Sequence, residues 1–472
     1  MESVAESEFN LRPSENPMKK TKLYLLVSLF SLTPFTANAN SLLDVYELAL
    51  KNDAQLKADT AKYEAGLQNK AIGRAGLLPT ITAGASFTKS DIDTTNNLTN
   101  TTVNSDTDSL GWDISLTQPL FNMSLWYNYQ QGSKLSELAE AQYGADQQSL
   151  IVRVATAYFN VLRAIENLEA TIAEEQALGK QLEQAKQRFD VGLTAITEVH
   201  EAQAAYDSAT AATLEARGLI GINFEALEVL TGRQETAIAP LAPAFPVVPP
   251  SPANRADWVE FALKNNYGLK AAKLQADASL DSAKSTKAGH LPTLGLSLGY
   301  SDTDTDGTEA NTNFDTTREG SNISLNLNVP IYSGGETSAR SRQAYAQYNQ
   351  NFEIYNSTQR SVIQNARSLH LTMETDVARI QARKQAVVSN QSALEATQSG
   401  YEVGTRNLVE VLLAQRNLYQ ARRSYSDALF DYVINSFQLR EVAGMLTPAD
   451  VQAIDQWLQD NALRNRAQYD NY

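Results

Sequence analysis

The feature that most limits the fold of this chain is an internal duplication. Four short motifs recur in the same order at offsets of 211 to 213 residues. They are ALKN at Ala49 and Ala262, AGLLPT at Ala75 with AGHLPT at Ala288, the corner Gln118 to Phe121 with Val329 to Tyr332, and RFDVGLTAITEV from Arg188 with GYEVGTRNLVEV from Gly400. A nearly constant spacing over four landmarks indicates a duplicated unit of about 212 residues. Both halves are therefore expected to form the same elements.

Proline placement shows how each half is organised. None of the 14 prolines lies between 120 and 239 or between 331 and 446. Proline inside a helix costs about 3 kcal/mol, so these two zones are predicted to form long helices. Six prolines between Pro240 and Pro252 indicate a linker. The predicted layout is an N-terminal extension with signal peptide (1–39), a first repeat (40–237), the Pro-rich equatorial linker (238–253), a second repeat (254–446) and a C-terminal equatorial segment (447–472).

The N-terminal region carries a targeting signal. Three lysines follow Met18, an apolar run covers 23–32, and small residues occupy 37–39. This pattern is typical of a secretory signal peptide, whose apolar core is too short to span a bilayer. No later run approaches 18 consecutive apolar residues. The mature chain is therefore predicted to lie in the periplasm or outer membrane, with Met1 and Met18 both open as start codons.

Composition excludes several classes of function. The net charge of -15 disfavours nucleic acid, whose phosphates would be repelled. The lack of cysteine excludes disulfides, thiolate metal sites and a thiol nucleophile. The three histidines, His200, His290 and His370, are scattered. We therefore expect no enzyme, no cofactor and no metal.

Apolar residues in the proline-free zones recur at steps of three and four. The first series runs through Ile151, Val154, Tyr158, Val161, Ile165, Leu168 and Ile172, and the second through Val411, Ala414, Leu418, Ala421, Tyr425, Ala428 and Tyr432. Such steps define a coiled-coil seam, although an amphipathic helix on a globular core would show them too. Residues 122–190 are predicted as one helix of roughly 100 Å, returning through a helix that ends near Gly232. Another single helix is predicted at about 254–287.

Four stretches alternate with a period of two. Their apolar positions are Ile81 to Phe87, Leu110 to Leu116, Leu294 to Tyr300 and Ile323 to Val329. Each stretch spans roughly 9 to 11 residues, the length of a tilted membrane strand. A soluble half-buried sheet would also alternate, but here the polar face is small and uncharged apart from Asp113, and the chain is exported. A membrane barrel is favoured.

The alternating stretches form two predicted β-hairpins, at 79–121 and 292–332. Residues 91–109 and 302–320 are rich in Asp, Asn, Thr and Ser and are predicted as long external loops. Four strands cannot close a barrel, and open sheet edges in lipid are costly. The chain must therefore oligomerise. A dimer would give eight strands with a filled interior, and a trimer twelve strands with a pore.

Over nearly the whole mature chain, these features resemble the TolC family of outer membrane efflux proteins. The resemblance rests on the duplication, the two GxLPT strand entries and the paired turns VGLTAITEV and VGTRNLVEV. It implies an α+β membrane protein, a homotrimer with a twelve-stranded transmembrane β-barrel continued by a twelve-helix α-barrel that projects into the periplasm. It also implies an exit duct of tripartite efflux pumps or type I secretion, with a periplasmic adaptor and an inner-membrane transporter of the RND, ABC or MFS class as partners.

The resemblance also implies a periplasmic gate. In the closed state of the family, a Tyr, an Arg, a Thr and an acid link the coiled coils, and the matching residues are Tyr401, Arg406, Thr197 and Glu198, the acid being Glu where the family has Asp. An Arg paired with carboxylate and hydroxyl groups is a reasonable clasp. Ordinary turn-capping contacts are the alternative.

The aperture of the family carries two Asp positions one helical turn apart. The first matches Glu410, but the second is Leu413. One charged ring is therefore lost, which puts the cation affinity of the entrance in doubt.

Two other functions compete with the duct. A secreted coiled-coil adhesin would explain the helices but not four strands of bilayer length. A hydrolytic enzyme would need a polar constellation that the sequence does not show. The sequence leaves open which transporter and adaptor the protein serves and whether its cargo is a drug or a protein.

Overall fold

The computed structural model describes residues 41–310, 312–459 and 462–469. The predicted signal peptide lies outside these residues, as does part of the predicted C-terminal segment. Nowhere in the described ranges does a helix combine the length and apolar character needed to cross a membrane.

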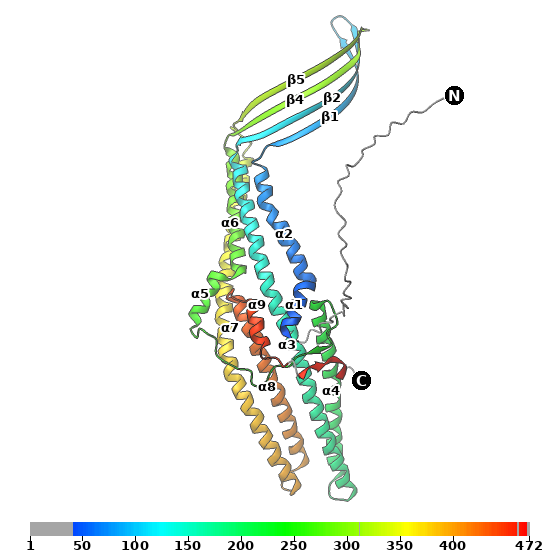
Figure 1. Ribbon diagram of the computed structural model, residues 1–472, viewed down its shortest axis with the longest axis vertical. Helices are drawn as coiled ribbons and strands as arrows, with labels where there is room; N and C mark the ends of the chain where they lie inside the picture. The colour runs from blue at the N-terminus through cyan, green and yellow to red at the C-terminus, as the bar shows by residue number, and fades with distance from the viewer. Residues whose placement is uncertain (1–40, 311, 460–461, 470–472) are drawn as a thin grey trace, which may run out of the picture. The chain divides into compact units, whose positions relative to one another are not determined.

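Two long helices organise the chain (Figure 1). The helices are α1 (Leu42–Asn52), α2 (Ala54–Ala75), α3 (Met123–Asp190), α4 (Ile196–Thr231), α5 (Arg255–Asn265), α6 (Tyr267–Lys287), α7 (Glu336–Glu402), α8 (Leu408–Val442) and α9 (Pro448–Asp455). The strands are β1 (Thr80–Asn96), β2 (Thr101–Phe121), β3 (Ala237–Ile238), β4 (Thr293–Glu309), β5 (Thr312–Asn328) and β6 (Arg464–Asn465). The predicted helix at 122–190 is confirmed by α3, and the return helix α4 ends before Gly232, as predicted.

Helix α3 is the axis of the described chain. Its first half packs against α2, where Ser136 Oγ donates to the Leu67 carbonyl at 3.0 Å, and its second half packs against α4. Helices α6 and α8 pack against it as well. The predicted seam is confirmed, because Val154, Tyr158 and Val161 are each at most 1% exposed. Short helices thus stack along one long rod, as the helix lengths predict.

The linker and the C-terminal segment lie beside the middle of α3. The Tyr158 hydroxyl donates to the Ala239 carbonyl at 2.8 Å. Strand β3 pairs antiparallel with β6, and Arg464 of β6 forms an ion pair with Glu169 of α3 at 2.7 Å. These contacts hold the linker and the C-terminal segment at the level of the middle of α3.

The four long strands form one antiparallel sheet in the order β1-β2-β4-β5 (Figure 1). Strands β1 and β5 are its free edges. The predicted long loops at 91–109 and 302–320 are wrong, because the strands continue through most of both segments. Polar side chains bond across the strands there, as Asn104 does to Asp91 at 2.8 Å and Thr95 to Thr102 at 3.0 Å. Since these bonds stabilise pairing without apolar burial, polarity alone does not end a strand.

The single helix predicted at about 254–287 is also wrong. It is divided into α5 and α6 at Asn266, whose backbone is extended (φ -61°, ψ 119°). The Asn266 side chain accepts a hydrogen bond from the Leu269 N–H at 2.8 Å and so begins a new helix. Asp53 makes the same break between α1 and α2 in the first repeat. The break is thus part of the duplicated unit.

Candidate functional site

Two short turns join the long helices to their return helices, and they contain the predicted gate residues. Residues 191–195 link α3 to α4, and residues 403–407 link α7 to α8. Each turn has a glycine in the left-handed region, Gly192 (φ +75°) and Gly404 (φ +79°). A residue with a Cβ is strained there, which explains why VG recurs in both copies. The two turns therefore end their hairpins in the same way.

A small apolar cluster packs where the helices meet the turns. It is formed by Leu182, Ala185, Ala202, Tyr401, Leu408 and Val411. These residues come from α3, α4, α7 and α8. The cluster therefore ties both hairpins together close to their ends.

Tyr401 is the most buried of the predicted gate residues. It is 6% exposed, and its hydroxyl donates to Glu198 Oε2 at 3.2 Å, from α7 to α4. The Arg188 guanidinium lies over the Tyr401 ring, 4.8 Å from its centroid. Burial raises the pKa of Tyr401 above its ordinary value, and the charge of Glu198 raises it further, against the opposing effect of Arg188. The hydroxyl is therefore a proton donor at neutral pH.

Arg406 does not meet Thr197 or Glu198 within one chain. Its Nη1 lies 2.6 Å from Glu410 Oε2, one turn along its own segment, and both side chains are partly solvated. Such exposed pairs contribute about 0–1 kcal/mol. Thr197 is exposed on α4. Of the four predicted gate residues, the described chain brings Tyr401 and Glu198 together and leaves Arg406 and Thr197 facing outward.

The two predicted aperture residues lie near the start of α8. Asn407 caps this helix, accepting from the Glu410 N–H at 3.0 Å. Glu410 and Leu413 are one turn apart on one face. Leu413 is 52% exposed, so its side chain is available to line an opening.

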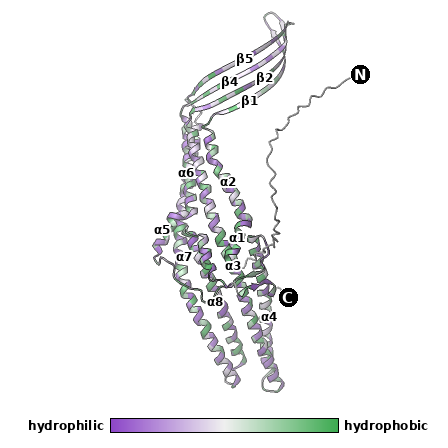
Figure 2. Cartoon of the chain, in the orientation of Figure 1, coloured by the Kyte–Doolittle hydropathy of each residue, from purple (hydrophilic) through white to green (hydrophobic). Residues whose placement is uncertain are grey.

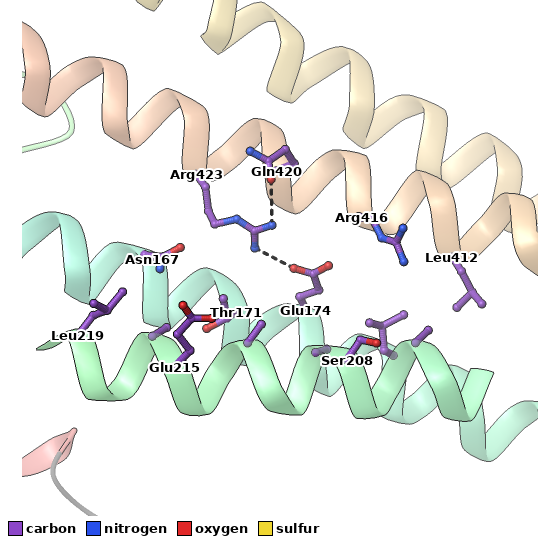
Figure 3. A pocket seen from close by; sticks show the side chains of 15 residues that line it. Asn167, Thr171, Glu174, Ser208, Glu215, Leu219, Leu412, Arg416, Gln420 and Arg423 are labelled. Carbon is purple, nitrogen blue, oxygen red and sulfur yellow. Dashed lines mark hydrogen bonds and ion pairs between the residues drawn. The ribbon is translucent and has the colours of Figure 1, made fainter. Parts of the chain in front are cut away.

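Above the turns, α3, α4 and α8 enclose a cleft of about 460 Å³ (Figure 3). Its wall includes an ion pair between Arg423 of α8 and Glu174 of α3, at 2.8 Å and with both side chains less than one-fifth exposed. Gln420 accepts a hydrogen bond from the same arginine at 3.3 Å (Figure 3). Farther toward the turn, Arg416 also lines the cleft. The two coiled coils are thus held together at the tip cluster and again at this pair.

Sequence patterns did not point to Arg188, Asn407 or the Arg423–Glu174 pair. Asn407 followed by Glu410 is a recognisable helix-start signature and was available in the sequence. The other two contacts join helices far apart in the chain, so finding them requires the register of one coiled coil against the other. No single-sequence pattern provides that register.

The comparisons with known proteins decide the family. The model of the family described as outer membrane efflux protein matches residues 45–233 and 258–445. The chain belongs to this family. The two matched segments are the two copies of the duplicated unit.

Individual relatives agree with this assignment. The chain is 36% identical to outer membrane protein TolC of Vibrio cholerae, over 88% of this chain and 93% of that protein. It is 30% identical to the proteases secretion protein PrtF of Dickeya chrysanthemi, over 95% of this chain and 97% of that one. The alkaline protease secretion protein AprF of Pseudomonas aeruginosa is also 30% identical, over 93% of this chain and 91% of that one. These relatives are named for export rather than for catalysis.

Solved structures show the same fold. The outer membrane protein VceC of Vibrio cholerae superposes with a TM-score of 0.73 at 21% identity, covering 85% of this chain and 96% of that one. The open state of the MtrE outer membrane channel of Neisseria gonorrhoeae superposes with a TM-score of 0.68 at 19% identity, covering 86% and 90%. The relatives at 30% identity or more include TolC and two protease secretion proteins. On their evidence, the protein is an outer-membrane exit duct of the kind that serves efflux and type I secretion, and the adhesin alternative is not favoured.

Proposed function

We propose that three copies of this chain form a continuous duct, a twelve-stranded β-barrel in the outer membrane joined to a twelve-helix tunnel in the periplasm. The free edges of β1 and β5 carry this proposal. An unpaired edge in lipid leaves backbone N–H and C=O groups without partners, at several kcal/mol each. Three four-stranded sheets joined edge to edge satisfy every strand and leave a pore.

The exposed sides of the helices support association. On α4, Leu214, Ile222 and Val229 are 56 to 76% exposed along one stripe, and on α7 Leu371 and Val388 are 54 and 55% exposed. Apolar stripes on helices that already pack on one side favour burial against further helices. Each chain supplies α3, α7 and two stacked sets of shorter helices, which is four rod-lengths for a tunnel of twelve.

We further propose that the turns are the periplasmic gate. Tyr401 with Glu198 forms the contact inside one chain, while Arg406 and Thr197, which face outward, would bond to neighbouring copies. Three Glu410 side chains would then ring the aperture, with Leu413 as an apolar collar. The proposed layout places the linker 238–253 and the C-terminal segment around the equator, supported by the pairing of β3 with β6.

The duct is proposed to receive cargo from an inner-membrane transporter through a periplasmic adaptor. Relatives named for efflux and for protease secretion support both kinds of cargo for this chain. Deleting the gene and measuring drug resistance and protein secretion in parallel tests this, with complementation by the intact chain as control. Loss of neither activity would contradict the proposal.

Assembly is tested on the purified protein. In detergent, light scattering should give a protein mass three times that of the mature chain, and planar bilayers should show discrete channels. A folded monomer that inserts alone into bilayers would refute the barrel.

A further inference from the structure

The two faces of the sheet differ in chemistry. Residues that oppose each other in register project to the same face. One face, here named the apolar face, carries Ile81, Ala83, Ala85 and Phe87 of β1, Leu110, Trp112, Ile114 and Leu116 of β2, Leu294, Leu296, Leu298 and Tyr300 of β4, and Ile323, Leu325 and Leu327 of β5. The other face is mainly Gly, Ser, Thr and Asn. Figure 2 shows hydrophobic and hydrophilic residues along all four strands. Phe87 is 68% and Ile323 80% exposed, so the apolar face is uncovered in one chain.

The apolar face ends at different heights on different strands. Phe87 and Leu110, which are opposed, are its last apolar residues on β1 and β2. In the same hydrogen-bonded row, β4 already carries Asp304 and β5 carries Thr317. The last apolar residue is Tyr300 on β4, four positions lower than that row, and Ile323 on β5, six positions lower.

The other end of the apolar face slants in the same sense. It begins at Ile81 on β1, in a row with Leu298 and Ile323. On β4 and β5 it extends four residues farther, to Leu294 and Leu327. Over the three strand steps, the block is therefore displaced by six residues at one end and by four at the other, about 1.3 to 2 residues per strand.

Tilted strands that cross a flat membrane are expected to carry their lipid-facing residues in such a slanted block. A plane of constant depth crosses the hydrogen-bonded rows at an angle when strands tilt by roughly 35–45°. At about 3.4 Å per residue against a strand spacing of about 4.8 Å, this displacement corresponds to a tilt of roughly 45 to 55°. The slant therefore matches strands that cross a bilayer obliquely.

We infer that the apolar face contacts outer-membrane lipid chains and that its slant fixes the register in which β1 of one copy pairs with β5 of the next. This inference rests on the proposed barrel. A continuous apolar block needs Phe87 of one copy opposite Ile323 or Leu325 of the next. The shift from the straight row must be even, because an odd shift would turn every apolar side chain to the other face.

A different pairing results if the hydrogen-bonded rows continue straight from β5 of one copy to β1 of the next; this junction between copies is here named the β1–β5 seam. The straight pairing would set Phe87 opposite Thr317, and Ala85 opposite Glu319. Glu319 would then lie at the depth of apolar residues on β1. A charge on the lipid side of a barrel is destabilising by up to a few kcal/mol, so the shifted register is favoured.

The absence of cysteine makes the seam easy to test. The double variants Phe87→Cys/Ile323→Cys and Phe87→Cys/Leu325→Cys should link copies covalently when purified trimers meet a short thiol cross-linker. The matched control is Phe87→Cys/Thr317→Cys. Its second thiol lies six residues from position 323 and eight from position 325, roughly 20 to 26 Å along the strand. Ile81→Cys/Leu116→Cys, opposed within one chain, controls for reagent access.

Dimers and trimers on denaturing gels are expected from at least one of the first two variants and not from the Thr317 variant. Linkage through Thr317 alone would overturn the inferred register. The inferred register would also be overturned if no seam variant were linked although the protein remained trimeric and the Ile81/Leu116 control reacted. If the unsubstituted chain is monomeric, the proposed barrel itself fails, which is a separate result.

Contact between the apolar face and lipid can be measured separately with spin labels. A spin label at Ala83→Cys should collide with oxygen, which concentrates in lipid, more than with a water-soluble nickel chelate. A label at Ser86→Cys, on the other face of β1, should show the reverse. Equal exposure of both labels to the chelate would overturn the assignment of the apolar face to lipid.

Discussion

Helices α3 and α7 occupy equivalent places in the two repeats, yet only α3 is enclosed by its own chain. They contain 68 and 67 residues, but 22 are buried in α3 and 7 in α7, so duplication preserved length without preserving environment. Phe159 is fully buried, while Leu371, 212 positions later, is 54% exposed. Helices α2, α4, α6 and α8 surround α3, whereas α5, α6 and α8 contact α7. This difference supports the proposal that α7 packs against another copy of the chain.

The largest effect should come from these equivalent positions. Phe159→Ala should lower the free energy of unfolding by about 3–5 kcal/mol, since it leaves a cavity in the core. Leu371→Ala should leave the fold of each chain intact and weaken association. Thermal melts and trimer dissociation in detergent separate the two outcomes. Equal loss of folding stability in both variants would contradict the conclusion that the chain encloses α3 but not α7.

Two adjacent arginines on α8 give a second comparison between the surroundings of α3 and those of α7. Arg423 bonds to Glu174 of α3 at 2.8 Å in a largely buried pair, whereas Arg422 bonds to Gln391 of α7 at 3.2 Å near the surface. Glu174→Gln and Arg423→Gln should each cost about 1–3 kcal/mol, because a charged partner is left poorly satisfied. Arg422→Gln should cost well under 1 kcal/mol. Denaturant unfolding of the three variants measures this, and a larger loss at Arg422 would contradict the assignment of α3 as the buried axis.

The two turns offer a smaller contrast. Tyr401 is buried, but its equivalent in the first repeat, Phe189, is 40% exposed. The double variant Tyr401→Phe/Arg406→Ser should raise conductance in planar bilayers. Each hydrogen bond that it removes is expected to stabilise the closed state by about 0.5–1.5 kcal/mol. Phe189→Leu is the matched control and should leave conductance unchanged. A correctly folded double variant with unaltered conductance would show that the residues only shape the turn.

The smallest effect concerns ion selectivity. Glu410 is equivalent to Glu198, whereas Leu413 stands where the first repeat has Glu201. Three Glu410 carboxylates around an axis should attract cations, so Glu410→Gln should reduce cation selectivity. Leu413→Asp should add a second ring and tighten block by a trivalent cation. Single-trimer currents with the cation on the periplasmic side measure both. If neither substitution changes its readout, the constriction lies elsewhere.

Regular features of the fold could be predicted from the sequence, because they depend on local patterns. The turns at Gly192 and Gly404, the seam around Tyr158 and the positions of the hairpins follow from glycine, apolar spacing and proline. The break at Asn266 was missed because an asparagine cap can interrupt a helix without any proline. The pairing of Arg406 with Glu410 was missed because the family motif describes contacts between copies, while one chain satisfies the arginine locally.

The polar continuation of the hairpins determines where flow through the duct can be stopped. In the first hairpin, the strands end at Asn96 and Thr101, so the connecting segment is four residues, 97–100. A segment this short, held at both ends by paired strands, cannot fold inward as a plug across a wide mouth. Since α3 separates the sheet from the turns by about 100 Å, occlusion at the cell surface and closure at the periplasmic end are physically independent. In the proposed duct this hairpin would leave the exit open, so retention of cell contents would depend on the far end of the helices.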